Sequence, residues 1–465
     1  METQKLFIKT FGCQMNVADS EYIASMLITS GNFEITQDIT LADVIIVNTC
    51  SVRQHAEDRA QSFIGKLKKL KTKTTTSKNS AEKPKIVVIG CFAQRAKFEL
   101  QKRFPFIDII AGPLDYEYLP EMLNSTFDLS TTTKSKLHLN LFNKISVFVP
   151  IMSGCDNFCS YCVVPYLRGR EKSRDPEDVL QEVKALLDLG VREIVLVGQN
   201  VNSYIGQVMK VHSSQSTFYS SVINNETETI SFANLLELVA NLNTTQKFWI
   251  RFLTNHPKDM NYDIVKVIKK YPNISRHIHL PLQSGSNRIL QLMNRNYTVE
   301  KYKEIVQMIR YEIPEISITT DLIVGFPTET EEDFKKTMQA VEELQFDSAF
   351  VFKYSPRQGT KAAELPDDIP KQTKERRHFE LLKLCDDIAR NKNKRYFNTI
   401  QEVLIISQTN KNNLLAKTLS NKTVEVKTVK QGKLKPGIFT FVKITGVKKH
   451  SLTGSILTNS TVSTT

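Results

Sequence analysis

The stretch Gly154-Cys155-Asp156-Asn157-Phe158-Cys159-Ser160-Tyr161-Cys162 decides the fold, and it follows an apolar run over residues 145–152. Its three cysteines have the spacing C-x3-C-x2-C. Three closely spaced thiolates leave one iron of a [4Fe–4S] cluster without a protein ligand, and such an iron can bind a small molecule. Zinc sites usually pair two C-x2-C elements, or combine one with histidines, and no Cys or His follows Cys162 for many residues. The spacing therefore favours an iron–sulfur cluster over a zinc site or three ordinary buried thiols.

The region before this stretch, residues 1–125, has the pattern of an open parallel α/β sheet. Apolar runs at 6–8, 44–47 and 86–89 predict buried strands, each followed by a helical pattern, and a fourth run at 107–111 completes the sheet. We expect Asp19-Ser20-Glu21 to cap the first helix and Gly31 to end it. Residues 71–83, rich in Lys, Thr and Ser, predict a solvated loop.

Three further cysteines, Cys13, Cys50 and Cys91, each follow one of these strands within a few residues. Ligands of an open parallel sheet bind in the crevice outside the carboxyl ends of its strands. We therefore expect these three thiols to converge in space and to hold a second cluster. The alternative is three independent core cysteines, which requires the same placement to arise three times.

Residues 140–370 predict a partial (β/α)6 TIM-like barrel. Strand patterns occur at 145–152, 193–198, 248–253, 277–282, 317–324 and 348–354, with helical patterns between them. The chemistry of such barrels lies at the carboxyl ends of the strands. Here those ends carry the three-cysteine stretch, Gly198-Gln199-Asn200, residues 283–286 and Gly325-Phe326-Pro327. A segment rich in Ser, Thr and Asn, residues 207–229, interrupts the barrel as a surface insertion.

The carboxy-terminal part begins with a basic connecting helix, residues 371–396, in which Cys385 lies among apolar residues and is expected to pack in the core. Residues 397–460 alternate short β-type runs with turns and predict a small β-barrel. Its charged residues are lysines apart from Glu402 and Glu425, and the whole chain carries 62 Lys and Arg against 49 Asp and Glu, a net charge of +13. This distribution favours a nucleic-acid partner, although a basic module without a ligand is the alternative.

The sequence has no stretch long and apolar enough for a membrane span, and its first residues lack the pattern of a signal peptide. An odd number of cysteines, seven, argues against a disulfide framework and for reduced, metal-binding thiols. We therefore expect a cytoplasmic protein without a membrane partner.

Five stretches carry recognisable motifs: residues 154–171, Thr10-Phe11-Gly12-Cys13-Gln14-Met15-Asn16, and residues 198–204, 251–257 and 354–360. They resemble one known family, the radical S-adenosylmethionine (SAM) methylthiotransferases, and the resemblance covers essentially the whole chain. Within that family they are similar to the MiaB branch, which modifies N6-dimethylallyladenosine at position 37 of transfer RNA. The resemblance implies a methylthiotransferase domain, a radical SAM barrel and a carboxy-terminal TRAM domain that binds RNA. The TRAM region departs from the family pattern because it lacks arginines.

The resemblance also implies roles for individual residues. Cys155, Cys159 and Cys162 would hold the cluster that binds SAM, and Cys13, Cys50 and Cys91 an auxiliary cluster that carries the sulfur to be inserted. One SAM would be the radical source and another the methyl donor, with both clusters facing one cavity. By their position at the rim, Tyr161 would contact the adenine of SAM, Gly198, Gln199 and Asn200 its methionine end, and Gly325 would allow close backbone approach.

The expected partners are the anticodon stem-loop of tRNA and an electron donor such as flavodoxin or ferredoxin, and we expect a monomer. Two other functions stay open at this point. One is methylthiolation of N6-threonylcarbamoyladenosine or of a ribosomal-protein aspartate, although the residues around Cys13 do not fit the patterns of those branches. The other is a cluster-bearing RNA-binding protein without catalysis, against which two three-ligand sites argue, because an electron carrier generally closes its cluster with four cysteines.

Overall fold

The computed structural model describes residues 3–29, 32–52, 54–72, 84–123, 144–207, 229–410, 413–427 and 434–457. The chain divides into two compact units. Unit 1 comprises Met1–Phe142, Phe148–Phe158 and Cys162–Lys172, and unit 2 comprises Asn143–Val147, Cys159–Tyr161 and Ser173–Thr465. The three-cysteine loop therefore contributes residues to both units, and each unit is described here by itself.

Unit 1 is built on a parallel sheet of five strands in the order β2-β1-β3-β4-β5. The chain adds a strand on one side of β1 and then reverses to the other side, so β1 and β3 flank a topological switch point, where ligands of such sheets bind. The short edge strand β2 was not predicted, because three residues make too short an apolar run. The strands are β1 (Gln4–Phe11), β2 (Phe33–Ile35), β3 (Val44–Thr49), β4 (Lys85–Gly90) and β5 (Ile109–Ala111).

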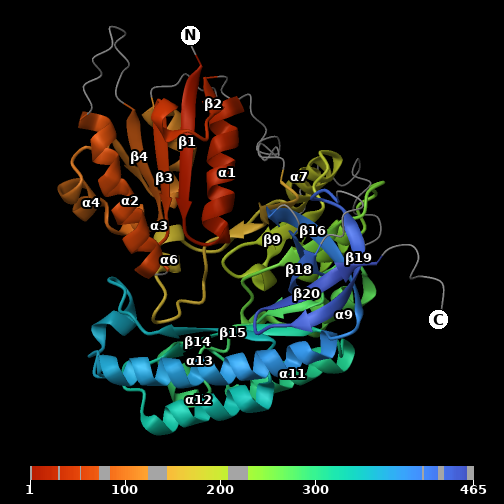
Figure 1. Cartoon of the computed structure of the whole chain (residues 1–465). Coiled ribbons are helices and arrows are strands. Elements are labelled where there is room, and N and C mark those ends of the chain that lie inside the picture. Colours follow the sequence, from red (N-terminus) through yellow and green to blue (C-terminus); the bar gives the residue numbers. More distant parts are fainter. Residues whose placement is uncertain are drawn as a thin grey trace. The chain divides into compact units, whose positions relative to one another are not determined.

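Helices cover both faces of this sheet, as Figure 1 shows for α1 on one side and α2 on the other. On one face Ile23, Met26 and Leu27 of α1 pack against the strands. On the other, Ile64 and Leu67 of α2 do the same. Because both faces are covered, the central strands are apolar throughout, which is why their runs were recognisable. The helices are α1 (Gln14–Thr29), α2 (Gln54–Thr72), α3 (Cys91–Arg95), α4 (Lys97–Arg103) and α5 (Leu119–Met122).

The predicted start of the first helix was wrong, because α1 begins at Gln14 and Asp19-Ser20-Glu21 lies inside it. The side chain of Asn16 accepts a hydrogen bond from the backbone N–H of Cys13 at 3.2 Å, so the helix starts directly after that cysteine. Gly31 lies outside the described residues. The loop predicted at 71–83 was wrong at its first two residues, Lys71 and Thr72, because they belong to α2; residues 73–83 lie outside the described residues.

Unit 2 contains the predicted partial barrel apart from residues 148–150 of its first strand, which belong to unit 1. Its strands form two parallel three-stranded sheets, β12-β9-β6 and β13-β14-β15, and a parallel bridge between Ile250 and Ile274 continues the series from β12 toward β13. The six strands thus follow one another in chain order, as in an open barrel. They are β6 (Ser146–Pro150), β9 (Glu193–Val197), β12 (Trp249–Phe252), β13 (His277–His279), β14 (Ser317–Val324) and β15 (Ser348–Lys353).

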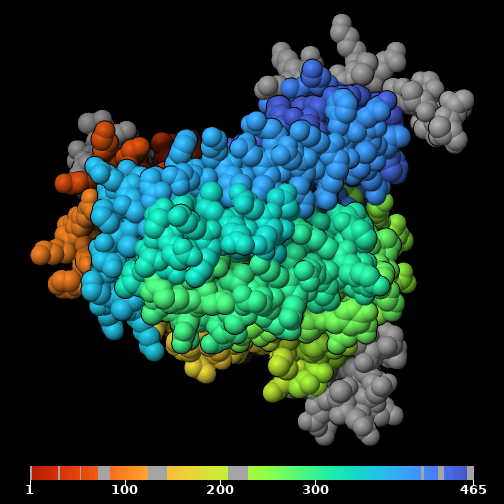
Figure 2. Space-filling view, turned by 90° about the horizontal axis from the view of Figure 1, so that it is seen from below, coloured from red at the N-terminus to blue at the C-terminus, as the bar shows by residue number. Residues whose placement is uncertain are grey.

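The helices of the barrel alternate with these strands, and in Figure 2 this part of the chain forms the green and cyan surface. Short strands β10 (Ile205–Gln207) and β11 (Thr229–Ser231) pair with each other and bracket the predicted insertion, whose residues 208–228 are not described. Strands β7 (Met152–Ser153) and β8 (Lys172–Ser173) and helix α6 (Val164–Arg168) flank the cysteine loop. The barrel helices are α7 (Pro176–Asp188), α8 (Phe232–Ala240), α9 (Tyr262–Lys270), α10 (Asn287–Leu292), α11 (Val299–Glu312) and α12 (Glu331–Leu344).

The connecting helix α13 (Lys371–Asn393) leads into a closed five-stranded barrel in the order β16-β17-β18-β20-β19, which confirms the expected TRAM-like module. Cys385 of α13 is buried, as predicted. Strand β17 was missed in the sequence because its apolar residues, Leu414, Leu415 and Ala416, are helix formers rather than β-branched or aromatic. The strands are β16 (Ile400–Asn410), β17 (Asn413–Thr418), β18 (Thr423–Lys427), β19 (Phe439–Val447) and β20 (Ser451–Ile456).

Two buried charges fix this small barrel to the partial barrel. Arg251 of β12 pairs with Glu193 of β9 at 2.5 Å and donates to the carbonyl oxygens of Thr418 and Leu419 at 2.8 and 3.1 Å. Asp347 is fully buried and lies 2.8 Å from Arg395, 2.9 Å from Lys392 and 3.7 Å from Lys422. None of the helices in the described part of the chain combines the length and apolar character needed to cross a bilayer.

Candidate functional site

The three amino-terminal cysteines lie at the carboxyl ends of three neighbouring strands in unit 1. Cys13 follows β1 after Gly12, while Cys50 and Cys91 come directly after β3 and β4. Cys13 is hydrogen-bonded to Cys50, the charge of Cys91 acts on Cys50, and the charge of Cys13 acts on Cys91. A Cβ on Gly12 would lie 2.7 Å from the Cβ of Cys50, so only glycine permits this approach. The structure thus brings the three predicted thiols together at the switch point of the sheet.

The three thiols differ in their electrostatics. The hydrogen bond with Cys50 lowers the pKa of Cys13 to about 6. The same bond raises the pKa of Cys50, and burial raises the pKa of Cys91. The backbone N–H of Val52 donates to the Cys50 sulfur at 3.3 Å, and Arg168 Nε donates to the Cys91 sulfur at 3.3 Å. The site therefore favours the thiolate at Cys13 and directs N–H donors at the sulfurs of Cys50 and Cys91.

The chemistry of this donor set fits a [4Fe–4S] cluster. Three soft sulfur donors converge, and N–H groups point at two of the sulfurs, as is usual around cluster thiolates. Over the described ranges, no three His, Cys, Asp or Glu side chains are grouped as the ligands of a single metal ion would be. A cluster does not require that grouping, because each thiolate bonds to a different iron.

In the cluster-free protein we expect Cys13 to be alkylated by iodoacetamide at a rate that rises with pH and has its midpoint near its pKa of about 6. The thiolate is the nucleophile, so the rate follows the deprotonated fraction. Mass spectrometry of labelled peptides measures this. Cys385 serves as the control, because burial raises its pKa to about 12 and it should stay unlabelled. A Cys13 midpoint at about 8.5, the value of an ordinary thiol, would contradict the geometry.

The loop that carries Cys155 is tightly fixed within unit 1. The N–H of Cys155 donates to the carbonyl of Gly169 at 3.2 Å, and Asn157 Nδ2 donates to the Cys155 sulfur at 3.4 Å. Gly154 has φ +76°, and a Cβ there would clash with the carbonyl of Arg170. The turn therefore needs glycine immediately before the first cysteine of the motif.

Cys159 belongs to unit 2, where Arg295 Nη1 donates to its sulfur at 3.3 Å. The next residue, Ser160, donates from its backbone N–H to the carbonyl of Met293 at 3.0 Å and accepts from the N–H of Ala362 at 2.8 Å. Tyr161 is half-buried and packs against an apolar cluster that includes Phe326. The barrel thus holds the second cysteine of the motif between two of its loops.

The segment after the third cysteine packs on the amino-terminal thiols. Val163 and Leu167, both buried, contact Cys91. Arg168 at the end of α6 donates to the Cys91 sulfur and pairs with Asp19 at 2.5 Å. All of these residues belong to unit 1. The chain that begins at Cys162 is therefore part of the surroundings of Cys91.

The rim of the partial barrel carries buried polar atoms without partners. Asn200 Nδ2 donates to Asp259 at 2.8 Å, and Asn255 Nδ2 donates to the carbonyl of His279 at 2.9 Å. In both residues the amide oxygen therefore points away from the group that the amide nitrogen binds. These two oxygens and Gln199 Oε1 accept no hydrogen bond from any described residue. Buried acceptors of this kind are satisfied when a ligand supplies ammonium or hydroxyl groups.

His256 adds a buried donor beside them. The N–H of Lys258 donates to its Nδ1 at 3.3 Å, which places the ring proton on Nε2. Burial, with Arg295 and Lys258 nearby, lowers the pKa of His256 to about 2, so the ring is neutral. Its Nε2 has no partner among the described residues. Sequence reasoning did not assign Asn255 or His256, although both follow a predicted strand, which is the signal that selected Gln199 and Asn200.

The loops after β9 and β12 are joined to each other. Val201 donates from its N–H to the carbonyl of Thr254 at 3.0 Å, and Thr254 Oγ1 donates to the carbonyl of Gly198 at 2.7 Å. Asn202 exchanges two hydrogen bonds with the backbone of His256, at 3.0 and 3.1 Å. The unpartnered atoms of both loops are therefore held at one place on the rim.

Gly325, the last of the predicted SAM contacts, lies at the end of β14 with φ +68°. Its N–H donates to Glu329 Oε2 at 2.7 Å. Glu329 is fully buried and pairs with Arg377 of α13 at 2.7 Å, while its Oε1 has no hydrogen-bond partner in the described chain. A Cβ on Gly325 would clash with the side chain of Lys374. The glycine therefore accommodates α13.

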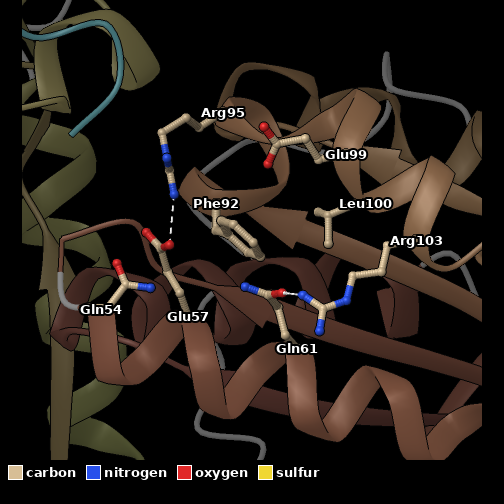
Figure 3. Close-up of a pocket in the computed structure, with 8 residues that line it drawn as sticks. All are labelled: Gln54, Glu57, Gln61, Phe92, Arg95, Glu99, Leu100 and Arg103. Atoms are coloured by element: carbon tan, nitrogen blue, oxygen red, sulfur yellow. Dashed lines mark hydrogen bonds and ion pairs between the residues drawn. The ribbon is translucent and has the colours of Figure 1, made fainter. Parts of the chain in front are cut away.

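A hollow of about 270 Å³ lies elsewhere in unit 1, between α2, α3 and α4 (Figure 3). Arg95 pairs there with Glu57 at 2.7 Å and donates to Ser51, the neighbour of Cys50, at 2.7 Å. Arg103 is hydrogen-bonded to Gln61. Arg95 and Glu57 thus neutralise each other within the hollow, and the cysteines do not line it. The lining residues are Gln54, Glu57, Gln61, Phe92, Arg95, Glu99, Leu100 and Arg103.

Both the partial barrel and the amino-terminal sheet are similar to known protein families. Residues 149–341 match the radical SAM superfamily and residues 5–112 match the uncharacterized protein family UPF0004. A structure of the cobalamin-dependent SAM radical enzyme OxsB has a TM-score of 0.51 at 12% identity, covering 83% of this chain and 56% of that one. The radical SAM methyltransferase TsrM from Kitasatospora setae has a TM-score of 0.52 at 12% identity, covering 78% and 77%. The cysteine loop on this barrel defines a radical SAM enzyme.

Two curated relatives carry the same name, tRNA-2-methylthio-N(6)-dimethylallyladenosine synthase. The protein of Caldicellulosiruptor saccharolyticus is 42% identical over 97% of this chain and 92% of its own length. That of Thermodesulfovibrio yellowstonii is 40% identical over 98% of this chain and 100% of its own. The chain belongs to the tRNA-2-methylthio-N(6)-dimethylallyladenosine synthase family. Membership confirms the methylthiotransferase interpretation of the sequence, with [4Fe–4S] clusters and SAM as cofactors.

Proposed function

We propose that this chain attaches a methylthio group to C2 of N6-dimethylallyladenosine at position 37 of tRNA, with two [4Fe–4S] clusters and two molecules of SAM. The packing of Val163, Leu167 and Arg168 on Cys91 carries this proposal. It makes the segment that follows the radical SAM motif part of the surroundings of the second thiol group. Two cysteine triads linked in this way suit a reaction in which sulfur and a radical meet on one base.

Cys155, Cys159 and Cys162 would hold one cluster, and Cys13, Cys50 and Cys91 the other. When bound, the first cluster and SAM supply a radical that can remove an unactivated C2–H, and the second supplies the sulfur. The protein's part is to orient the thiols and to donate hydrogen bonds to their sulfurs, as Asn157, Arg295, Val52 and Arg168 do. Each triad leaves one iron open for a small ligand.

The rim of the barrel would bind SAM. Gln199 and Asn200, joined by Asn255, present acceptor oxygens that suit the ammonium and hydroxyl groups of SAM, and His256 presents a donor. Gly198 and Gly325 lie at the ends of β9 and β14, and Tyr161 at the adenine side. Because the amide orientations are set by Asp259 and the His279 carbonyl, the acceptors need no rearrangement to receive a ligand.

The closed barrel would bind the anticodon stem-loop of tRNA. Lys427, Lys435 and Lys443 are exposed on it, and such charges hold phosphates without reading sequence. Position 37 lies in a single-stranded loop, so its base can turn into a pocket at modest cost. The domains of this proposal are residues 1–125, 140–370, the helix 371–396 and 397–460. A flavodoxin or ferredoxin would donate electrons to a cytoplasmic monomer.

Nucleoside mass spectrometry of tRNA from a deletion strain tests the proposed substrate. We expect the 2-methylthio form of N6-dimethylallyladenosine to disappear and the unmodified precursor to accumulate, with both restored by the wild-type gene. Intact 2-methylthio-N6-dimethylallyladenosine would overturn the proposal. Loss of the 2-methylthio form of N6-threonylcarbamoyladenosine instead would assign the chain to the alternative tRNA substrate.

A further inference from the structure

Each cysteine triad has one buried arginine that donates to one of its sulfurs. Arg168 Nε lies 3.3 Å from the Cys91 sulfur, and Arg295 Nη1 lies 3.3 Å from the Cys159 sulfur. The two residues are 7% and 4% exposed. A guanidinium stays charged at any physiological pH, so each triad has a permanent cation at hydrogen-bond distance.

The two arginines differ in their counter-charges. Arg168 forms a two-point contact with the carboxylate of Asp19, at 2.5 and 3.5 Å, so the pair is neutral. Arg295 uses its other N–H groups on neutral oxygens: the carbonyl of Pro281 at 3.2 Å and the hydroxyl of Tyr297 at 3.1 Å. No carboxylate in the described part of the chain pairs with Arg295. The surroundings of Cys159 therefore carry an uncompensated positive charge, and those of Cys91 do not.

This difference bears on electron transfer. One-electron reduction of a thiolate-bound cluster adds one negative charge, which a nearby cation stabilises, strongly so where water is excluded. Hydrogen bonds to the sulfurs act in the same direction. A cation already neutralised by a carboxylate contributes its hydrogen bond but little net field. The cleavage of SAM requires an electron at the cluster on Cys155, Cys159 and Cys162, which is the triad with the uncompensated charge.

We propose that Arg295 is a positioning residue that directs the electron to the cluster on Cys155, Cys159 and Cys162, by favouring its one-electron reduction. At the cluster on Cys13, Cys50 and Cys91, Asp19 neutralises Arg168, so the positive charge of Arg168 does not favour reduction of that cluster. The inference rests on the proposed function, because it takes both triads as cluster ligands. The electron comes from a low-potential one-electron donor, and no other bond changes.

The test is a potentiometric titration of the reconstituted full chain without SAM, monitored by electron paramagnetic resonance. The iron content of every variant is measured as well. Arg295→Gln removes the charge and keeps an amide donor, whereas Arg295→Lys keeps the charge. We expect Arg295→Gln to lower the reduction equilibrium constant of the first cluster at least tenfold, about 59 mV for one electron. Arg295→Lys should shift it less, and neither should move the signal of the second cluster.

Asp19→Asn provides the matched experiment at the other triad. It leaves the charge of Arg168 uncompensated, so the potential of the second cluster should rise while that of the first is unchanged. An unchanged first-cluster potential in Arg295→Gln, with iron for both clusters present, would overturn the inference and leave the proposed function intact. Iron for only one cluster in the wild-type chain would overturn the proposed function and the role of Asp19.

Discussion

Replacing Cys155, Cys159 or Cys162 by alanine will abolish both 5′-deoxyadenosine formation and methylthiolation, to the level of a no-enzyme control. The loss of any one thiolate removes a ligand that the open-iron cluster needs to bind and cleave SAM. The measurement is liquid chromatography with mass spectrometry of both products after anaerobic reconstitution with dithionite, SAM and tRNA.

Variants of the amino-terminal cysteines should lose one of the two products and keep the other. Cys13→Ala, Cys50→Ala and Cys91→Ala should abolish methylthiolation while 5′-deoxyadenosine still forms, because the radical motif is intact in them. Cys385→Ala is the control; this buried thiol of α13 belongs to neither triad, and its variant should keep both activities. A methylthiolated product from Cys13→Ala would exclude that residue from the sulfur-carrying site.

Arg251→Met will lower the free energy of unfolding of unit 2 by about 3 kcal/mol, the low end of the usual 3–5 kcal/mol for half of a buried ion pair. The change leaves the fully buried Glu193 without its main partner and removes the bonds to the carbonyls of Thr418 and Leu419. Lys417, 3.8 Å from Glu193, offsets part of the loss. Denaturation followed by fluorescence measures it, since the single tryptophan, Trp249, is buried against Phe439 at 4.9 Å between ring centroids.

Lys266→Met is the matched control for this stability change. Lys266 pairs with Asp263 at 3.6 Å on the surface of α9, with side chains 57% and 75% exposed. An exposed pair of this kind contributes about 0–1 kcal/mol. If Arg251→Met were no more destabilising than Lys266→Met, the buried ion pair would not be what fixes the two barrels together.

The sequence predicted secondary structure best where burial alone determined which residues a strand contains. The runs at 44–47 and 86–89 are apolar throughout because both faces of β3 and β4 are covered, so their strands were predictable. The three-residue strand β2 and the alternating strand β17 lack that signal. The start of α1 was misplaced because Asp19-Ser20-Glu21 resembles a cap, whereas Asp19 in fact pairs with an arginine distant in the chain.

Some residues of the candidate site were likewise predictable from the sequence, and others were not. Spacing and strand ends were sufficient to select the six cysteines and Asn200, because those features are local in sequence. The arginines could not be selected, since Arg168 meets Cys91 across 77 residues and Arg295 meets Cys159 across 136. Such pairings depend on the packing of distant segments, which no local pattern encodes. Asn255 and His256 were accessible to the strand-end argument but were not assigned.

Cluster content in two triple variants tests most directly whether the two triads hold separate clusters. After anaerobic reconstitution, a chain with Cys13, Cys50 and Cys91 all changed to alanine should retain one [4Fe–4S] cluster that still responds to SAM in its electron paramagnetic resonance spectrum. A chain with Cys155, Cys159 and Cys162 changed should retain one cluster that supports no cleavage of SAM. Loss of all iron from either variant, with its fold intact by circular dichroism, would contradict two independent clusters.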